Sequence, residues 1–107
     1  MLRSMYSGIS GLRTHQTMMD VVGNNISNVN TAGYKSSSTV FQDMLSQTMQ
    51  GAGAPVNGAG GTNPAQVGLG VKLAGISTNF AQGATQLTGR ATDLAIQGDG
   101  FFAVRQG

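Results

Sequence analysis

Apolar residues recur along the first quarter of the chain at intervals that indicate one long helix. They follow alternating steps of three and four residues, which is the a/d register of a heptad repeat. Ser4 is the predicted N-cap, and Asn28, Asn30 and Gly33 are the predicted stop signals. The helix is therefore expected over roughly residues 2–28, with a length of about 40 Å. The apolar stripe comprises Leu2, Met5, Ile9, Leu12, Met19 and Ile26, with Gln16 and Gly23 at the two intervening positions.

Such a helix is longer than a chain of this size can readily cover. A compact domain of ~100 residues has a radius of gyration near 13 Å. An isolated helix is marginal in water, because most helical stability comes from packing the apolar face. The apolar stripe is therefore expected to pack against a partner that this chain does not contain.

The middle of the chain changes character twice. Between Tyr34 and Gln50, the apolar residues recur at helical spacing, so a short helix is possible there. From Gly51 to Gly70 the sequence is rich in glycine and holds both prolines, which favours a linker or a long loop. The apolar residues at helical spacing are Val40, Phe41, Met44, Leu45 and Met49.

The last third of the chain has the alternation of β-strands. Apolar residues alternate up to Leu73 and then change parity at Ala74-Gly75, which predicts a β-bulge at Gly75. Further on, Gly98-Asp99-Gly100 lies between two apolar segments, and an Asp-Gly pair in that setting is a strong hairpin signal. The flanking apolar residues are Leu94 and Ile96 before the turn, and Phe101, Phe102 and Val104 after it.

Composition narrows the possible functions. Charged residues make up 9% of the 107 residues, against about 25% in ordinary soluble domains. A chain with so little surface charge is either partly disordered or covered by other protein. The cations are isolated from one another, which excludes a nucleic-acid-binding patch. The chain has no cysteine and no apolar run near the ~20 residues of a membrane span, so we predict no disulfide, no thiolate metal site and no membrane insertion.

No set of residues suggests catalysis. His15 is the single histidine, the carboxylates are scattered, and no phosphate-binding loop is present. We therefore predict no enzyme activity, no catalytic residue, no metal site and no cofactor.

Two other functional classes have weaker support from the sequence. A membrane-active amphipathic helix needs a polar face rich in Lys and Arg, and Arg3 and Arg13 are too few. A small hydrolase lacks a convergent nucleophile, base and acid.

The helix end is unusually rich in asparagine, a poor helix-interior residue because its amide competes for backbone hydrogen bonds. Asn24, Asn28 and Thr31 lie at i, i+4 and i+7, on one face. Two interpretations stay open at this point. The segment is either a frayed helix end with a turn, or a ladder of neutral amides that bonds neighbouring helices.

Two segments carry a family resemblance. Residues 23–35 resemble the N-terminal signature of flagellar rod and hook proteins, and residues 88–102 resemble the family's second signature. Residues 60–71 and the first eight residues are most similar to the hook branch, with the distal rod branch as the alternative. The matching residues of the first signature are Gly23, Asn24, Asn25, Ile26, Asn28, Thr31, Gly33, Tyr34 and Lys35. Those of the second are Asp93, Leu94, Ile96, Gly98, Gly100, Phe101 and Phe102.

The resemblance implies an α+β fold in three parts. Residues 1–33 would form a coiled-coil-type assembly helix of the inner core. Residues 34–70 would form a linker with a possible short helix and a Gly/Pro-rich loop, and residues 71–107 would begin an antiparallel outer β domain. In the family the N-terminal helix pairs with a C-terminal helix of the same chain. This sequence lacks that second helix, so we expect the chain to be the N-terminal portion of a longer protein.

The resemblance also implies a function. The protein is expected to be a self-assembling structural subunit of the bacterial flagellar hook, exported without a cleaved signal peptide. Its expected partners are further copies of itself in a helical homopolymer, the rod, hook-cap and hook–filament junction proteins, and the flagellar type III export apparatus. We expect the apolar stripe to pack the helix pair and the Asn-rich end to contact neighbouring subunits.

Overall fold

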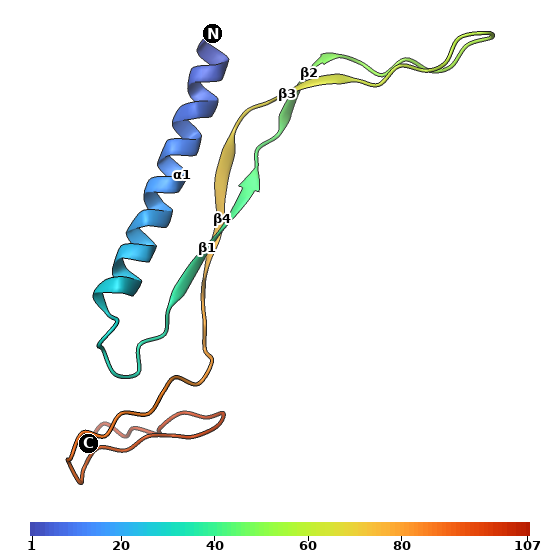
Figure 1. Ribbon diagram of the computed structural model, residues 1–107. Helices are drawn as coiled ribbons and strands as arrows, with labels where there is room; N and C mark the ends of the chain where they lie inside the picture. Colours follow the sequence, from blue (N-terminus) through green and yellow to red (C-terminus); the bar gives the residue numbers. More distant parts are fainter.

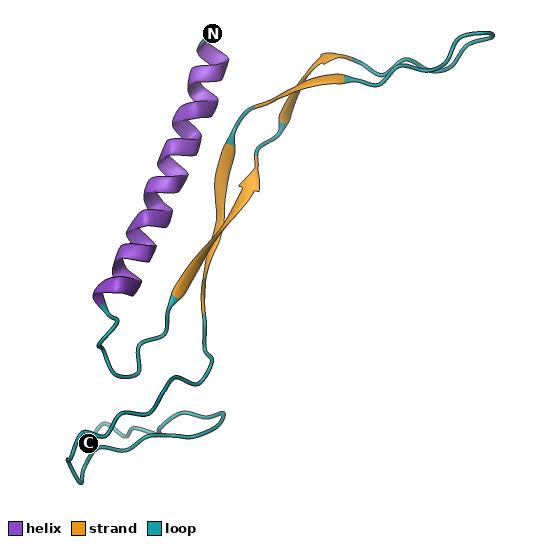
Figure 2. Cartoon of the chain, viewed as in Figure 1, coloured by secondary structure: helices purple, strands orange, loops and turns teal.

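One long helix is followed by four strands in two antiparallel pairs. The computed structural model describes all 107 residues. Helix α1 spans Leu2–Ser27, as the heptad pattern predicts, and Met1 rather than Ser4 is its N-cap. The predicted cap is wrong because helical geometry already begins at Leu2, which places Ser4 inside the first turn. The strands are β1 (Ser37–Asp43), β2 (Ser46–Gln50), β3 (Ala65–Gly68) and β4 (Val71–Thr78) (Figures 1 and 2).

The strands form a long two-stranded ribbon that runs beside α1 and then leaves it. Strand β1 pairs with β4, and β2 pairs with β3 in the continuation of the same ribbon (Figure 1). The helix possible over residues 40–49 is therefore wrong, since these residues lie largely in β1 and β2. Pairing with residues 65–78 overrides their helical spacing, as tertiary context often does for short apolar segments.

The glycine-rich segment closes this ribbon. Residues 51–64 form its tip, where isolated bridges join Gly53 to Thr62 and Val56 to Ala59. The expected linker or loop over residues 51–70 is thus a hairpin tip followed by β3, rather than a connection between two separate bodies. Strand β3 pairs with β2, which precedes the glycine-rich segment, and composition alone does not reveal this pairing.

The predicted bulge is confirmed. Val40 lies opposite Gly75, and Phe41 lies opposite Leu73, so Ala74 is the extra residue on β4. This extra residue explains the change of parity in the sequence, because it moves the following side chains to the other face of the strand.

The hairpin predicted around Asp99 does not form. Residues 79–107 contain no strand, and Phe101 and Phe102 are exposed. Gly98 and Gly100 have φ values of 113° and 154°, so the backbone turns near Asp99 without strand pairing. An isolated two-stranded hairpin is marginal in water, and nothing in this chain packs against the segment to stabilise it.

The molecule is extended and has no apolar core. Its extents are 82 × 32 × 30 Å and its radius of gyration is 24.3 Å, against roughly 13 Å for a compact chain of this length. No hydrophobic residue is fully buried. The chain therefore exposes apolar surface that an ordinary domain would bury.

Candidate assembly surface on the N-terminal helix

Helix α1 turns a largely polar face toward the ribbon, and this face also includes the half-buried Met18 and Val21. Thr14, at 9% exposure, is the single buried residue of the chain and lies at the middle of this face. Its hydroxyl donates to the carbonyls of Ser10 and Gly11 at 3.0 and 2.9 Å, so its polar atom is satisfied within the helix. The residues of this face that are buried or half-buried include Arg3, Ser7, Ser10, Thr14, Thr17, Val21, Asn25 and Asn28.

The apolar stripe lies on the opposite side of the helix. At 3.6 residues per turn, its mean direction is roughly 160° away from that of the covered face. Ile9 and Leu12 are 42% and 73% exposed, and the other four members of the stripe are also exposed. The structure thus places all six predicted packing residues on one exposed side of α1, with Ile9 at its edge beside Val71 and Leu73 of β4.

A cluster of small residues, which we name the serine clasp, holds the middle of α1 against the ribbon. The Ser7 hydroxyl donates to the Gly68 carbonyl at 3.3 Å. The Ser10 hydroxyl donates to the Ser7 carbonyl at 2.7 Å and accepts the Val71 amide at 3.3 Å. Gly70 lies against the same turn with φ of 110°, and a Cβ at this position would overlap the Ser10 Oγ. Only glycine permits this close approach.

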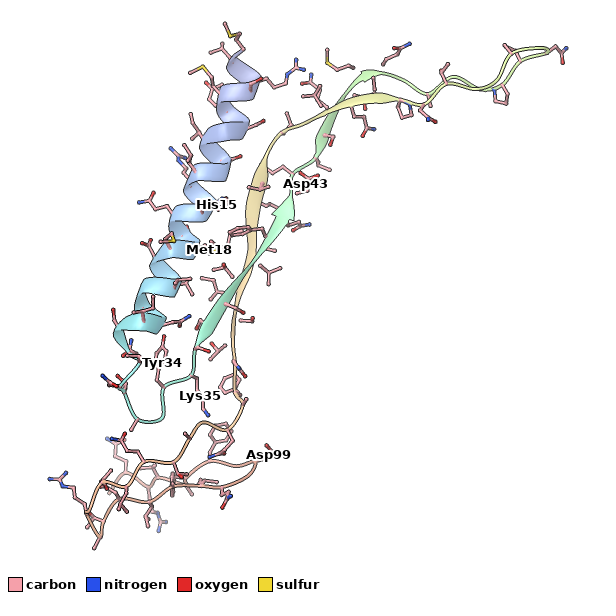
Figure 3. The ribbon with its side chains drawn as sticks, in the orientation of Figure 1. His15, Met18, Tyr34, Lys35, Asp43 and Asp99 are labelled. Atoms are coloured by element: carbon pink, nitrogen blue, oxygen red, sulfur yellow. The ribbon has the colours of Figure 1, made fainter.

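A second cluster, the asparagine corner, fixes the turn from α1 into β1. The Asn25 amide donates to the Ser37 carbonyl at 2.7 Å, and its Oδ1 accepts the Ser37 amide at 3.1 Å. The Tyr34 hydroxyl donates to the same Oδ1 at 2.9 Å and accepts the Asn24 amide at 3.0 Å. Asn25 therefore pairs with β1 as a neighbouring strand would. Tyr34 is labelled in Figure 3, at the end of α1.

The remaining asparagine contacts run along one face of the helix end, as their spacing predicts. The Asn28 amide donates to the Asn24 Oδ1, and the Thr31 hydroxyl donates to the Asn28 Oδ1, both at 3.1 Å. Gly33 then takes φ of 73° in the turn that follows. The Asn-rich segment is thus an ordered helix end with a hydrogen-bonded ladder inside one chain. A contact of these residues with neighbouring subunits stays a prediction.

The second signature lies away from both clusters. The Lys35 ammonium donates to the Ala81 carbonyl at 2.9 Å, which ties the first signature to the start of the C-terminal segment. Within that segment the Gln82 amide donates to the Ile96 carbonyl at 3.2 Å, and the Asp93 amide donates to the Arg90 carbonyl at 3.3 Å. Leu94, Phe101 and Phe102 are exposed, and the structure does not bring them to the apolar stripe.

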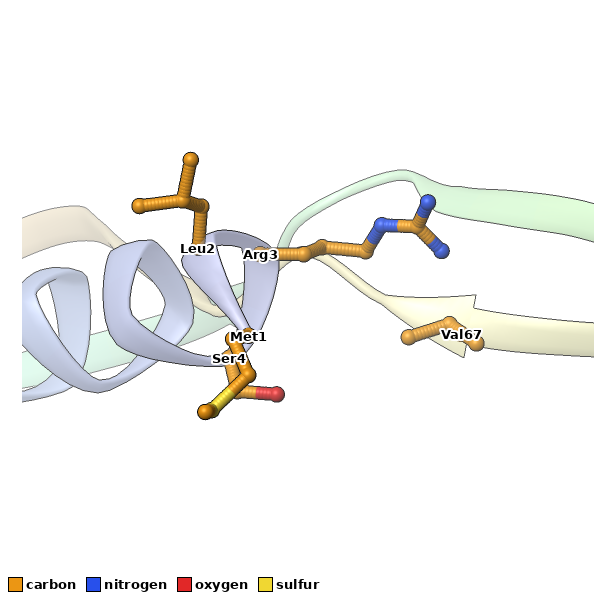
Figure 4. Close-up of a pocket in the computed structure, with 5 residues that line it drawn as sticks. All are labelled: Met1, Leu2, Arg3, Ser4 and Val67. Atoms are coloured by element: carbon orange, nitrogen blue, oxygen red, sulfur yellow. The ribbon is translucent and has the colours of Figure 1, made fainter.

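No arrangement of side chains resembles a catalytic or metal-binding site. His15 is exposed; its Nδ1 donates to the Gly11 carbonyl at 2.8 Å, and the centroid of its ring lies 5.2 Å from that of Phe41. No three His, Asp or Glu residues lie close enough to hold a metal ion. The hollow at the helix start is an open depression lined by Met1, Leu2, Arg3, Ser4 and Val67 (Figure 4). Helix α1 is not apolar enough along its length to cross a bilayer.

Comparison with known proteins identifies the family. Residues 5–35, which cover most of α1 and the asparagine corner, match the family model described as flagella basal body rod protein. Over 107 residues the chain is 57% identical to the flagellar hook protein FlgE of Borreliella burgdorferi, covering all of this chain and 24% of that protein. The chain belongs to the flagellar rod and hook protein family. It is also 54% identical over 107 residues to the flagellar basal-body rod protein FlgG of Bacillus subtilis, of which it covers 40%.

Both relatives are named as parts of the flagellum, one as a hook protein and the other as a basal-body rod protein. The chain spans about a quarter of the hook protein and two fifths of the rod protein. The residues that sequence analysis missed are Ser7, Ser10 and Gly70. The signal for Ser7 and Ser10 was present as small residues at three- and four-residue spacing on α1, opposite the apolar stripe. Gly70 lies between β3 and β4, and its contact with α1 has no local signal.

Removal of the Asn25 side chain is expected to loosen the asparagine corner. Asn25→Ala leaves the Ser37 amide and carbonyl without their partner. A hydrogen bond is worth about 1 kcal/mol, so amide exchange at Ser37 should quicken by about fivefold or more. Hydrogen exchange on the complete gene product measures this. Asn30→Ala is the matched control, because Asn30 is exposed in the same motif, and equal exchange in both variants would contradict the assignment.

Proposed function

We propose that this chain is the N-terminal assembly segment of a self-assembling structural subunit of the flagellar hook. The observation that carries the proposal is the apolar stripe of α1, which faces away from the chain's own ribbon. Burial of apolar surface is the main favourable term in protein association. A continuous exposed stripe on an ordered helix is therefore suited to packing in an assembly.

The low charge of the exposed surface supports assembly from identical copies. Residues 44–71 contain no Lys, Arg, Asp, Glu or His, although nearly all of them are exposed. Identical subunits packed side by side bring like groups together, and like charges would then repel. A nearly uncharged ribbon avoids that repulsion. We infer that the partners are further copies of the protein, and that rod, hook-cap and junction proteins adjoin the polymer after type III export.

The distal rod is the second candidate, because the full-chain identity to a rod protein is nearly as high as that to a hook protein. A deletion strain distinguishes the two. Electron microscopy of its basal bodies should show complete rods without hooks if the protein forms the hook. Truncated rods would instead assign it to the distal rod, and intact flagella would contradict both assignments.

We further propose that the ribbon tip influences how the polymer bends. Residues 51–64 lie beyond both clusters, so replacing them by a two-residue Asn-Gly turn shortens the ribbon without removing a contact to α1. The variant is expected to fold as a monomer and to form polymers of altered stiffness or curvature. Electron microscopy of isolated hooks provides the measurement. Polymers with unchanged curvature and stiffness would count against a role of the tip.

A further inference from the structure

The extreme end of the ribbon is a two-residue turn with an unusual sequence. Val56 and Ala59 form the last bridge, and the Ala59 amide donates to the Val56 carbonyl at 2.9 Å. Asn57 and Gly58 fill the turn, and Gly58 has φ of 88°, a left-handed conformation that favours glycine. The turn lies at the far end of the ribbon from the C-terminal segment (Figure 1).

The groups that could react with each other in this turn are free. Asn57 and Gly58 are both exposed, and neither the Asn57 side chain nor the Gly58 amide makes a hydrogen bond. A Cβ built on Gly58 would meet no atom within 4 Å, so no other part of the chain crowds this side of the turn. A single bridge holds the turn, and a hairpin end of this kind opens readily.

The other asparagines each lack one of these conditions. Asn24, Asn25 and Asn28 use their amides in the asparagine corner and ladder. The residue after Asn63 is Pro64, which has no amide hydrogen. Asn30 precedes Thr31, whose amide donates to the Asn28 carbonyl at 2.9 Å. The Asn79 side chain is held by the Ala81 amide, which donates to its Oδ1 at 3.0 Å. Asn57 is the one asparagine followed by glycine.

We propose that Asn57 is a site of self-modification, at which the side-chain amide is converted to a carboxylate with water as the only co-reactant. The Gly58 nitrogen loses its proton to solvent hydroxide and attacks the Asn57 Cγ. A C–N bond forms, the bond from Cγ to Nδ2 breaks, and the amide leaves as ammonia after taking up a proton. Water then opens the cyclic imide at either carbonyl, which gives aspartate or isoaspartate. Asparagine is among the chemically labile residues, and glycine offers the least hindered attacking nitrogen.

The modification changes the electrostatics of the tip. It places one negative charge per chain in residues 44–71, which otherwise hold no ionisable side chain. The nearest charged residues along the chain are Asp43 at the end of β1 and Lys72 near the start of β4. The chemistry requires only the exposed turn, so it stands or falls independently of the proposed assembly function.

Incubation of the complete gene product at mildly alkaline pH, followed by peptide mapping, tests the proposal. Aspartate and isoaspartate are expected to accumulate at position 57 ahead of positions 30 and 63, with a new acidic charge variant. The rate should rise with pH, because the attacking nitrogen must lose its proton. Asn57→Ser should abolish the acidic variant, and Gly58→Ala should slow its formation. Conversion at position 57 no faster than at position 30, or an acidic variant that persists in Asn57→Ser, would overturn the proposal.

Discussion

The complete gene product carrying Leu12→Asp is expected to fold but to fail to polymerise, and to leave a deletion strain non-motile. Burying a leucine is worth about 1.5–3 kcal/mol, and an unpaired carboxylate in the same contact costs several kcal/mol more. A loss of ~3 kcal/mol or more raises the concentration needed for assembly by roughly 100-fold or more. Because Leu12 is exposed in the single chain, the monomer itself should change little.

Sedimentation and motility assays measure this effect, and Ser4→Asp is its control. Ser4 is exposed on the same helix but lies off the apolar stripe, so the variant adds the same charge without entering the proposed contact. Normal polymers and normal motility with Leu12→Asp would contradict the proposal that the apolar stripe packs in the assembly. Equal loss with Ser4→Asp would mean that charge on α1, rather than loss of apolar packing, causes the defect.

The substitution Gly70→Val is expected to have the second largest effect, by opening the serine clasp. The new side chain would overlap the Ser10 Oγ, and a β-branched residue at φ of 110° is strained. Backbone strain of this kind costs of order 1–3 kcal/mol, and the bond from the Val71 amide to Ser10 would be lost as well. The ribbon should then separate from the middle of α1, and the polymer should dissociate at lower temperature.

Hydrogen exchange at the Val71 amide reports the state of the clasp directly, and a thermal melt reports the stability of the polymer. The matched control is Gly75→Ala on the same strand, where a Cβ meets no atom within 4 Å and φ is not positive. The control should change stability by less than about 1 kcal/mol. If the Val71 amide of the Gly70→Val variant exchanged its hydrogen at the wild-type rate, the serine clasp would not be what holds α1 against the ribbon.

The sequence was most informative where structure is local. The heptad spacing predicted α1 to within a residue at each end, and the parity change at Ala74-Gly75 predicted the bulge. Both features depend on neighbours along the chain. The spacing of Asn24, Asn28 and Thr31 likewise predicted one face of hydrogen-bonding side chains.

Long-range pairing was the part that sequence patterns could not supply. Residues 40–49 became strands because β4 and β3 lie beside them, and the tip formed because its two ends are held together. The expected hairpin around Asp99 failed for the converse reason, since no third strand covers it. The spacing of the apolar residues predicted the stripe, but it could not predict that the stripe faces away from the ribbon. That orientation depends on the contact between Ser10 and Gly70, which are 60 residues apart in the chain.

Cysteine accessibility tests the central claim most directly. Leu12→Cys, placed in the complete gene product after removal of every other cysteine, should react with a maleimide more readily in the monomer than in the polymer, where it should be protected. Ser4→Cys should react in both states. A Leu12→Cys that reacts as readily in the polymer as Ser4→Cys does would contradict the account of a helix whose apolar stripe is covered by other subunits or segments of the assembly.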